Sequence, residues 1–266
     1  MNKTLEIGRS GMLSQQSRLN RISGNLANVE TAGYKRSQVS FSAEVRMAMQ
    51  SDSVAVAEVP EDRLRGGGGV RALRDFTDLK QGMLTASPDF FDFAIEGTGF
   101  FGVRDEAGEL FLTRQGGFSL QEDGRLVDAS GRIAELALKP GASLTPETLK
   151  LEQLTLSGTG ELMEMDPSTG KTRTLGQLIL YDASNHAQGL ISAGESSFRP
   201  LDEGALYTNL EQPGAFGAVK ASSLERSNVN LLEEMTQLLM TQRAYQLSAK
   251  SVSSGDEMMQ MVNEIL

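Results

Sequence analysis

The first and last segments of this chain carry matching rows of residues, apolar except for one Tyr, spaced seven positions apart. The rows consist of Leu5, Met12, Leu19 and Leu26 at one end and of Leu231, Leu238, Tyr245, Val252, Met259 and Leu266 at the other. This heptad spacing is typical of helices that pack along one edge against another helix. An amphipathic helix on a globular core would explain one such row, but chain ends are usually frayed. Two rows at opposite ends therefore predict that the terminal helices pair as a coiled coil and form an assembly interface.

The charges of the two ends are opposite in sign. Residues 1–36 carry six basic and two acidic side chains, whereas residues 225–266 carry six acidic and three basic ones. Complementary charge favours the association of two segments and helps to fix their register. The charges therefore favour the same pairing as the heptad rows.

Composition bounds the function classes. With 266 residues, of which 39% are hydrophobic, the chain can bury a sizeable core and is expected to form more than one packed unit. A net charge of -10 argues against nucleic-acid binding, since phosphate contacts need clustered Lys and Arg. The absence of Cys excludes disulfides and thiolate metal sites. Polar residues interrupt the first 26 positions, which argues against a cleaved signal peptide, and no segment has the pattern of a membrane span.

The N-terminal helix is expected to end near Thr31 to Gly33, because Gly is a natural C-terminal cap. Residues 37–69 then mix polar residues with a short alternating apolar stretch and end in four successive glycines. This composition predicts an extended arm with a flexible joint. A disordered linker is the alternative interpretation of the same segment.

The middle of the chain is expected to be a β domain. Short apolar runs at 100–103, 110–113, 118–120 and 126–127 are separated by turn signals that each contain Gly. Later strands are expected at 149–156, 160–165, 174–181 and 189–191. The spacing of about ten residues between the early runs suits an antiparallel meander.

A second long helix is predicted from Ser227 or Asn230 to Leu266, with two acids in its first turn, where the helix dipole favours them. It would be roughly 55 to 60 Å long. The expected fold class is therefore α+β, with paired terminal helices and a central, mainly antiparallel β domain. The expected domains are 1–36 with 226–266 for the helices, 37–69 for the arm and 70–225 for the β domain.

No motif predicts catalysis, a cofactor or a metal site. The GxGxxG match from Gly97 to Gly102 runs into a strand rather than a helix, so it does not fit a dinucleotide site. The segment from Ser168 to Thr172 lacks the first Gly of a phosphate-binding loop, because residue 165 is Met. The one His, His186, stands in a polar segment without a partner pattern. We therefore expect no enzyme and no small-molecule substrate.

Three sets of motifs resemble the flagellar basal-body rod and hook protein family. At the N-terminal end they are Ser10, Gly11, Met12, Leu13, Asn25, Leu26, Ala27, Asn28, Val29, Glu30, Thr31, Ala32, Gly33, Tyr34, Lys35 and Arg36. At the C-terminal end they are Ser227, Asn228, Val229, Asn230, Glu234, Met235, Gln242, Arg243, Ala244, Tyr245, Gln246, Ala249, Lys250, Asp256, Glu257, Met258 and Met259. Residues 97–101 and 113–118 agree as well, and Gly24 departs from the Asn usual in the family.

The resemblance implies a structural subunit of the bacterial flagellar basal-body rod, a helical polymer that forms a tubular drive shaft and carries torque from motor to hook for motility. It implies export through the flagellar type III apparatus without a cleaved signal, from the cytoplasm to a basal body that spans the periplasm or cell wall. The implied partners are copies of the chain itself, other rod and hook proteins and the ring bushings. The length resembles that of rod proteins rather than that of the longer hook proteins. The segment 43–69 and residues 242–246 resemble the distal rod more than the proximal rod.

Two alternatives stay open. One is a proximal rod subunit of the same family. The other is a carbohydrate-binding β module outside the flagellum, with helical ends that dimerise, although the chain has no Trp and only four Tyr to stack on sugars.

Overall fold

The computed structural model describes residues 2–44, 69–140, 144, 153–165, 172–182, 190–194, 196–202 and 206–265. The chain forms two compact units. The helical unit comprises residues 1–27, 36–78 and 230–266, and the β unit comprises residues 28–35 and 79–229. The expected domain boundaries stay a prediction. By compactness, residues 37–44 and 69–78 group with the helices, and residues 45–68 of the expected arm lie outside the described residues.

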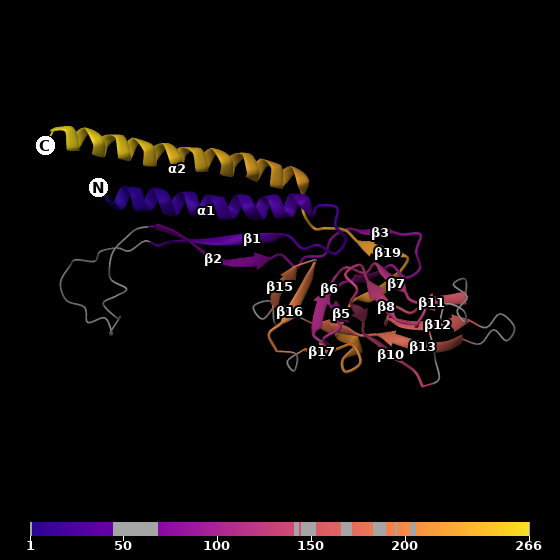
Figure 1. The fold of residues 1–266 in the computed structure, drawn as a ribbon. Coiled ribbons are helices and arrows are strands. Elements are labelled where there is room, and N and C mark those ends of the chain that lie inside the picture. The colour runs from indigo at the N-terminus through magenta and orange to yellow at the C-terminus, as the bar shows by residue number, and fades with distance from the viewer. Residues whose placement is uncertain are drawn as a thin grey trace. The chain divides into compact units, whose positions relative to one another are not determined.

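In its described residues, the helical unit consists of two helices and a hairpin (Figure 1). Helix α1 spans Asn2–Ala27 and helix α2 spans Leu231–Ile265. Strands β1 (Ser37–Glu44) and β2 (Gly69–Thr77) pair antiparallel from Ser37 opposite Thr77 to Glu44 opposite Gly69. Helix α1 packs against α2 and also against both strands of the hairpin. It is therefore the central element of this unit.

Helix α1 ends at Ala27, earlier than the sequence predicted. Beyond it, Asn28 accepts hydrogen bonds from the amide and the hydroxyl of Thr31, at 3.2 Å each, which closes a turn. Gly33 has a φ of +68° and does not cap the helix. Its ideal Cβ would lie 2.3 Å from the amide nitrogen of Gln115, so close packing in the β unit requires Gly there.

Helix α2 begins after an Asn cap, one of the two caps that the sequence predicted. The side-chain oxygen of Asn230 accepts hydrogen bonds from the amides of Leu232 and Glu233, at 3.1 and 3.3 Å. The backbone oxygen of Asn230 accepts the amide of Glu234 at 3.0 Å, which starts the helical ladder. Glu233 and Glu234 lie in the first turn, where their negative charges interact favourably with the positive end of the helix dipole.

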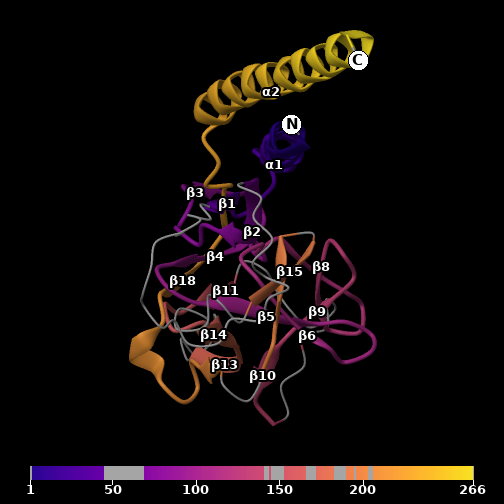
Figure 2. The same ribbon diagram turned by 90° about the vertical axis from the view of Figure 1, so that its left-hand side faces the viewer.

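The β unit contains the remaining strands and a short 3-10 helix, Pro213–Ala215 (Figures 1 and 2). The strands are β3 (Leu84–Ala86), β4 (Phe93–Glu96), β5 (Phe100–Arg104), β6 (Leu110–Thr113), β7 (Phe118–Leu120), β8 (Leu126–Asp128), β9 (Ile133–Ala134), β10 (Leu136–Leu138), β11 (Leu154–Leu156), β12 (Glu161–Met165), β13 (Thr172–Leu178), β14 (Leu180–Asp182), β15 (Leu190–Gly194), β16 (Ser197–Pro200), β17 (Tyr207–Thr208), β18 (Ala218–Ala221) and β19 (Ser223–Glu225).

Every strand pair of the described residues is antiparallel. The largest sheet has the order β15-β16-β6-β5-β9-β8-β7, with β14 paired to β5 and β17 to β14. A second sheet has the order β10-β13-β12-β11, and two pairs, β18-β4 and β19-β3, complete the unit. The order β5-β9-β8-β7 puts β9 beside β5, so the sheet departs from a simple meander.

Aromatic side chains fill the core of the β unit. Phe93, Phe101 and Phe118 are buried, and the rings of Phe101 and Phe118 meet edge to face with centroids 5.6 Å apart. A neighbouring cluster joins Phe100 to Phe198, with centroids 5.9 Å apart. Such pairs add to the free energy gained by burying the rings.

These elements confirm the predicted class: a helix at each end of the chain and a mostly antiparallel β domain between them. The early strands β5 to β8 match the predicted runs to within one residue. The later prediction of one strand over 174–181 was wrong in detail, since β13 and β14 join different sheets. The chain changes sheets at Ile179, whose amide binds the oxygen of Glu135 at 3.0 Å.

Candidate functional site

Close contacts between α1 and α2 bring the two chain ends together. A Cβ atom added to Gly8 would lie 2.4 Å from Cγ2 of Val252, and one added to Gly11 would lie 3.6 Å from Oγ of Ser248. At the other end of α1, Asn25 contacts Glu234. The residue numbers of the contacts in α2 therefore decrease as those in α1 increase. The two helices run antiparallel, as Figure 1 shows. Small residues allow the close approach at Gly8.

Some side chains of the predicted heptad rows are half-buried, and others are exposed. Met12, Leu19, Leu26, Leu238 and Val252 are half-buried. Leu231 and Tyr245 are 45% and 36% exposed. The side chains of Leu5, Met259 and Leu266 lie outside the described residues. The buried positions of α2 between the row members are Glu234 and Thr241, so polar residues share the contact between the helices.

Asn25 ties α1 to both of its neighbours. Its amide nitrogen donates to the backbone oxygen of Ser37 at 2.8 Å and to Oε2 of Glu234 at 3.2 Å. Its side-chain oxygen accepts the amide of Ser37 at 2.9 Å. Asn25 is only 2% exposed, so these hydrogen bonds satisfy a polar group that would otherwise be costly to bury.

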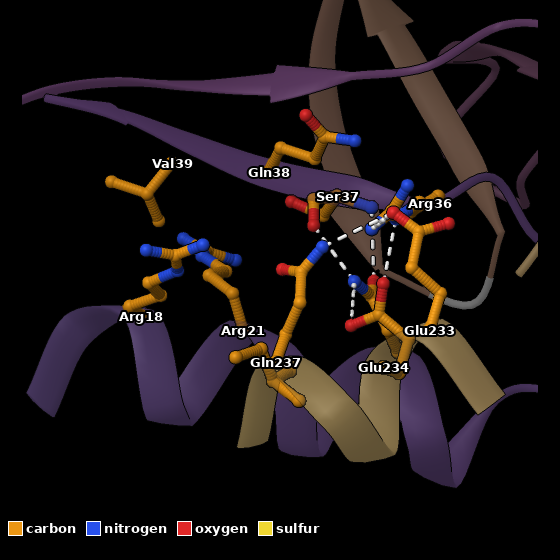
Figure 3. Close-up of a pocket in the computed structure, with 11 residues that line it drawn as sticks. Arg18, Arg21, Arg36, Ser37, Gln38, Val39, Glu233, Glu234 and Gln237 are labelled. Atoms are coloured by element: carbon orange, nitrogen blue, oxygen red, sulfur yellow. Dashed lines mark hydrogen bonds and ion pairs between the residues drawn. The ribbon is translucent and has the colours of Figure 1, made fainter. Parts of the chain in front are cut away.

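Arg36 joins the beginning of β1 to the first turn of α2 (Figure 3). Its Nε donates to Oε1 of Glu234 at 2.6 Å, and its NH2 donates to Oε1 of Glu233 at 2.9 Å. Burial alone would lower the pKa of Arg36, but the hydrogen bonds and charges of the two carboxylates outweigh it and raise the pKa. The basic N-terminal segment and the acidic C-terminal segment thus meet through this arginine.

A pocket of about 290 Å³ lies beside this ion pair. It is lined by Arg18, Arg21, Ile22, Asn25, Arg36, Ser37, Gln38, Val39, Glu233, Glu234 and Gln237. Figure 3 shows the side chains of Arg18 and Arg21 next to each other, near Val39 of β1. Within the part of the chain that the structure describes, no cluster of three or more His, Cys, Asp or Glu could hold a metal ion.

Helix α2 presents a second, apolar side to solvent. We call this set the apolar face; its members are Leu232, Met235, Leu239, Met240, Leu247, Met258 and Met261, each between 47% and 76% exposed. At 100° per residue they share the side of α2 opposite Thr241 and Ser248. A soluble monomer rarely exposes so many neighbouring large apolar side chains. The heptad row predicted for α2 does not include this face, although Leu232, Met235 and Leu239 repeat at helical spacing.

In the β unit, Glu225 is the centre of a buried ionic cluster. Its Oε1 accepts Nζ of Lys35 at 2.6 Å, and its Oε2 accepts NH1 of Arg114 at 3.1 Å. The amide of Gly82 donates to the same carboxylate at 2.7 Å, and the amide of Gly33 donates to the backbone oxygen of Glu225 at 2.7 Å. Burial lowers the pKa of Arg114, which still stays charged at neutral pH.

Three family models match the chain. They are described as a flagella basal body rod protein at residues 5–35, a flagellar hook protein FlgE/F/G D1 domain at residues 94–163, and the C-terminal part of the flagellar basal body rod FlgEFG proteins at residues 220–265. The flagellar basal-body rod protein FlgG of Buchnera aphidicola subsp. Schizaphis graminum is 31% identical over 269 residues, with 100% of both chains covered. This chain belongs to the flagellar basal-body rod protein family.

Other rod proteins agree with this assignment. FlgG of Agrobacterium fabrum is 31% identical with 99% of both chains covered, and FlgF of Mesorhizobium japonicum is 28% identical with 97% of this chain and 96% of the relative covered. The family resemblance stated from the motifs is therefore confirmed, as are a structural role in the rod and a place in the flagellar basal body. Among the described residues, no helix has the length and apolar character of a membrane span.

The family motifs hold specific contacts. Asn228 donates from its side chain to the backbone oxygen of Lys80 at 3.0 Å, and its amide donates to Tyr34 at 3.4 Å. Ser227 accepts the amide of Val229 at 3.3 Å. These motif residues therefore connect the chain segments that lead from α1 and into α2, within the β unit of this rod protein.

In α2, the motif residues Gln242, Arg243 and Tyr245 are exposed, whereas Ala244 is half-buried. Gly97 to Gly99 form a bend before β5, with φ of +118° at Gly97 and +120° at Gly99, and this confirms that the GxGxxG match runs into a strand. His186 and residues 166–171 lie outside the described residues.

Proposed function

We propose that this rod protein polymerises through its helical unit, and that α1 and α2 pair as a coiled coil in the assembled tube. The observation that carries the proposal is the apolar face, which the described part of the chain leaves open to solvent. Burial of this apolar surface between copies would favour association by about 25 cal/mol for each Å² removed from water. The helical unit, rather than a catalytic site, is then the functional part of the molecule.

The same proposal covers the partners and the position in the rod. The relatives named FlgG support the distal rod, and the similarity to FlgF keeps the proximal rod as the second candidate. Hook and neighbouring rod proteins, ring bushings and the type III export apparatus are the proposed partners, and torque transmission is the proposed mechanical role. No catalytic or cofactor-dependent activity is part of the proposal.

Assembly of the purified chain tests this function. We expect the wild-type protein to form filaments in electron micrographs and to sediment as its concentration rises. Leu239→Lys should stop sedimentation, because Leu239 is 59% exposed in the single chain and a charge at a buried contact must be desolvated. The matched control is Leu201→Lys in the β unit, at a side chain that is 68% exposed. Equal assembly of both variants would contradict the proposed interface.

A further inference from the structure

Four charged residues follow one another at heptad spacing along α2. We call this set the charged row: Arg243, Lys250, Glu257 and Glu264. Its sign changes from positive to negative halfway along. Residues seven apart lie on one side of a helix, and Arg243, Lys250 and Glu257 are exposed. The row runs among the exposed Leu239, Leu247 and Met258 of the apolar face.

Three charges of the row, Arg243, Lys250 and Glu257, have no ion-pair partner among the described residues. Opposite charges on one helix support each other at spacings of three or four residues. No residue at those spacings from Arg243, Lys250 or Glu257 carries an opposite charge. The row is thus complementary to a parallel copy of itself only when the two copies are shifted along the helix.

We propose that the charged row binds the same row of a second copy, with the two α2 helices parallel and displaced by two heptads. Arg243 of one copy then meets Glu257 of the next, and Lys250 meets Glu264. A shift of two heptads along a helix is about 21 Å. This inference rests on the proposed function, since it names the register of that polymer contact.

The parallel arrangement follows from the need for an open polymer. Antiparallel helices would pair Arg243 with Glu264 and Lys250 with Glu257 about a two-fold axis, and such a contact closes into a dimer. A shifted parallel contact uses different residues on each partner and can repeat without closing. The apolar side chains beside the row exclude water, which strengthens the charge pairing.

Charge reversal tests the pairing. Arg243→Glu with Lys250→Glu should raise the protein concentration needed for assembly about tenfold or more, because like charges would meet across the contact. Glu257→Lys with Glu264→Lys should do the same. The chain with all four reversals should assemble like the wild type. The control, Arg125→Glu with Arg199→Glu, makes the same charge change at side chains that are 61% and 52% exposed in the β unit. Circular dichroism checks the fold of each variant.

Disulfide cross-linking tests the register, because the chain has no Cys of its own. Arg243→Cys and Glu257→Cys chains, mixed and oxidised after assembly, should form mixed dimers, since a disulfide needs Cα atoms within roughly 7 Å. Cross-links between residues 250 and 257, or between 243 and 264, would instead support the antiparallel pair and overturn the proposal.

The two proposals fail in different ways. Suppose that wild-type protein assembles, but the charge reversals have no effect or the fourfold reversal does not restore assembly. The charged row then does not make the contact, and the proposed polymerisation is unaffected. If wild-type protein does not assemble at all, the proposed function fails and the register fails with it.

Discussion

Glu225 connects parts of the chain that are far apart in sequence. It binds Lys35, Gly82 and Arg114 through its carboxylate and Gly33 through its backbone, all inside the β unit. Lys35 and Glu225 are 3% and 1% exposed, so neither charge can turn to water for compensation. Removing one partner would leave an uncompensated buried charge.

Glu225→Gln should therefore destabilise the β unit by about 3–5 kcal/mol, because Lys35 and Arg114 would stay buried without their carboxylate. Urea unfolding followed by circular dichroism measures the change. Glu96→Gln is the control: the Glu96–Lys220 pair is 2.8 Å apart but about half exposed, so its loss should cost less than about 1 kcal/mol. Similar midpoints for both variants would contradict this role of Glu225.

Tyr181 provides a pH-dependent test. Burial, followed by its hydrogen bond to Glu135 and the charge of that carboxylate, raises the pKa of Tyr181 above its ordinary value. The pKa of a tyrosine in the unfolded chain is about 10. Because the pKa of Tyr181 is higher in the folded state, the contribution of its protonated form to folding stability is complete below about pH 10 and is lost as the pH rises further. In an absorbance titration, Tyr181→Phe should remove amplitude only from the most alkaline part of the curve. Loss of amplitude near pH 10 would contradict the assignment.

At the scale of elements, the sequence predicted both helices, the class of the central domain and the early strands, because these depend on local periodicity and turn residues. Asn230 was predictable as a cap for the same reason. The ionic cluster was not predictable, since Lys35, Arg114 and Glu225 meet only through the topology of the β unit. The helix end was misplaced because Gly33 serves close packing against Gln115, a contact that spacing along the chain does not reveal.

The contact between α1 and α2 makes a prediction about two glycines. Gly8→Ala should lower the melting temperature of the helical unit, because its Cβ would lie 2.4 Å from Cγ2 of Val252, a β-branched side chain with little freedom to move. Gly24→Ala is the control, since a Cβ there meets nothing within 4 Å and the change gains about 1 kcal/mol of helix propensity. Melting followed by circular dichroism compares them. An equal rise for both variants would mean that the helices do not approach closely at Gly8.

The two units of the whole molecule have different roles. The β unit has a core of buried aromatic and aliphatic side chains and a buried ionic cluster, so its stability comes from contacts within the unit. The helical unit leaves the apolar face and three members of the charged row, Arg243, Lys250 and Glu257, exposed in a single chain. A rod subunit needs such a division, since it must fold as one chain and then bind its copies through surfaces that folding leaves exposed.

The most direct test of this account is the accessibility of Leu239 before and after assembly. Leu239→Cys gives a chain with one thiol, because the natural sequence has none, and its rate of reaction with a thiol reagent reports exposure. The control is Leu201→Cys in the β unit. We expect that the thiol at residue 239 reacts rapidly in dispersed chains and becomes protected in filaments, whereas the thiol at residue 201 reacts at similar rates in both. Equal reactivity of residue 239 in dispersed chains and filaments would contradict the claim that the apolar face of α2 holds the polymer together.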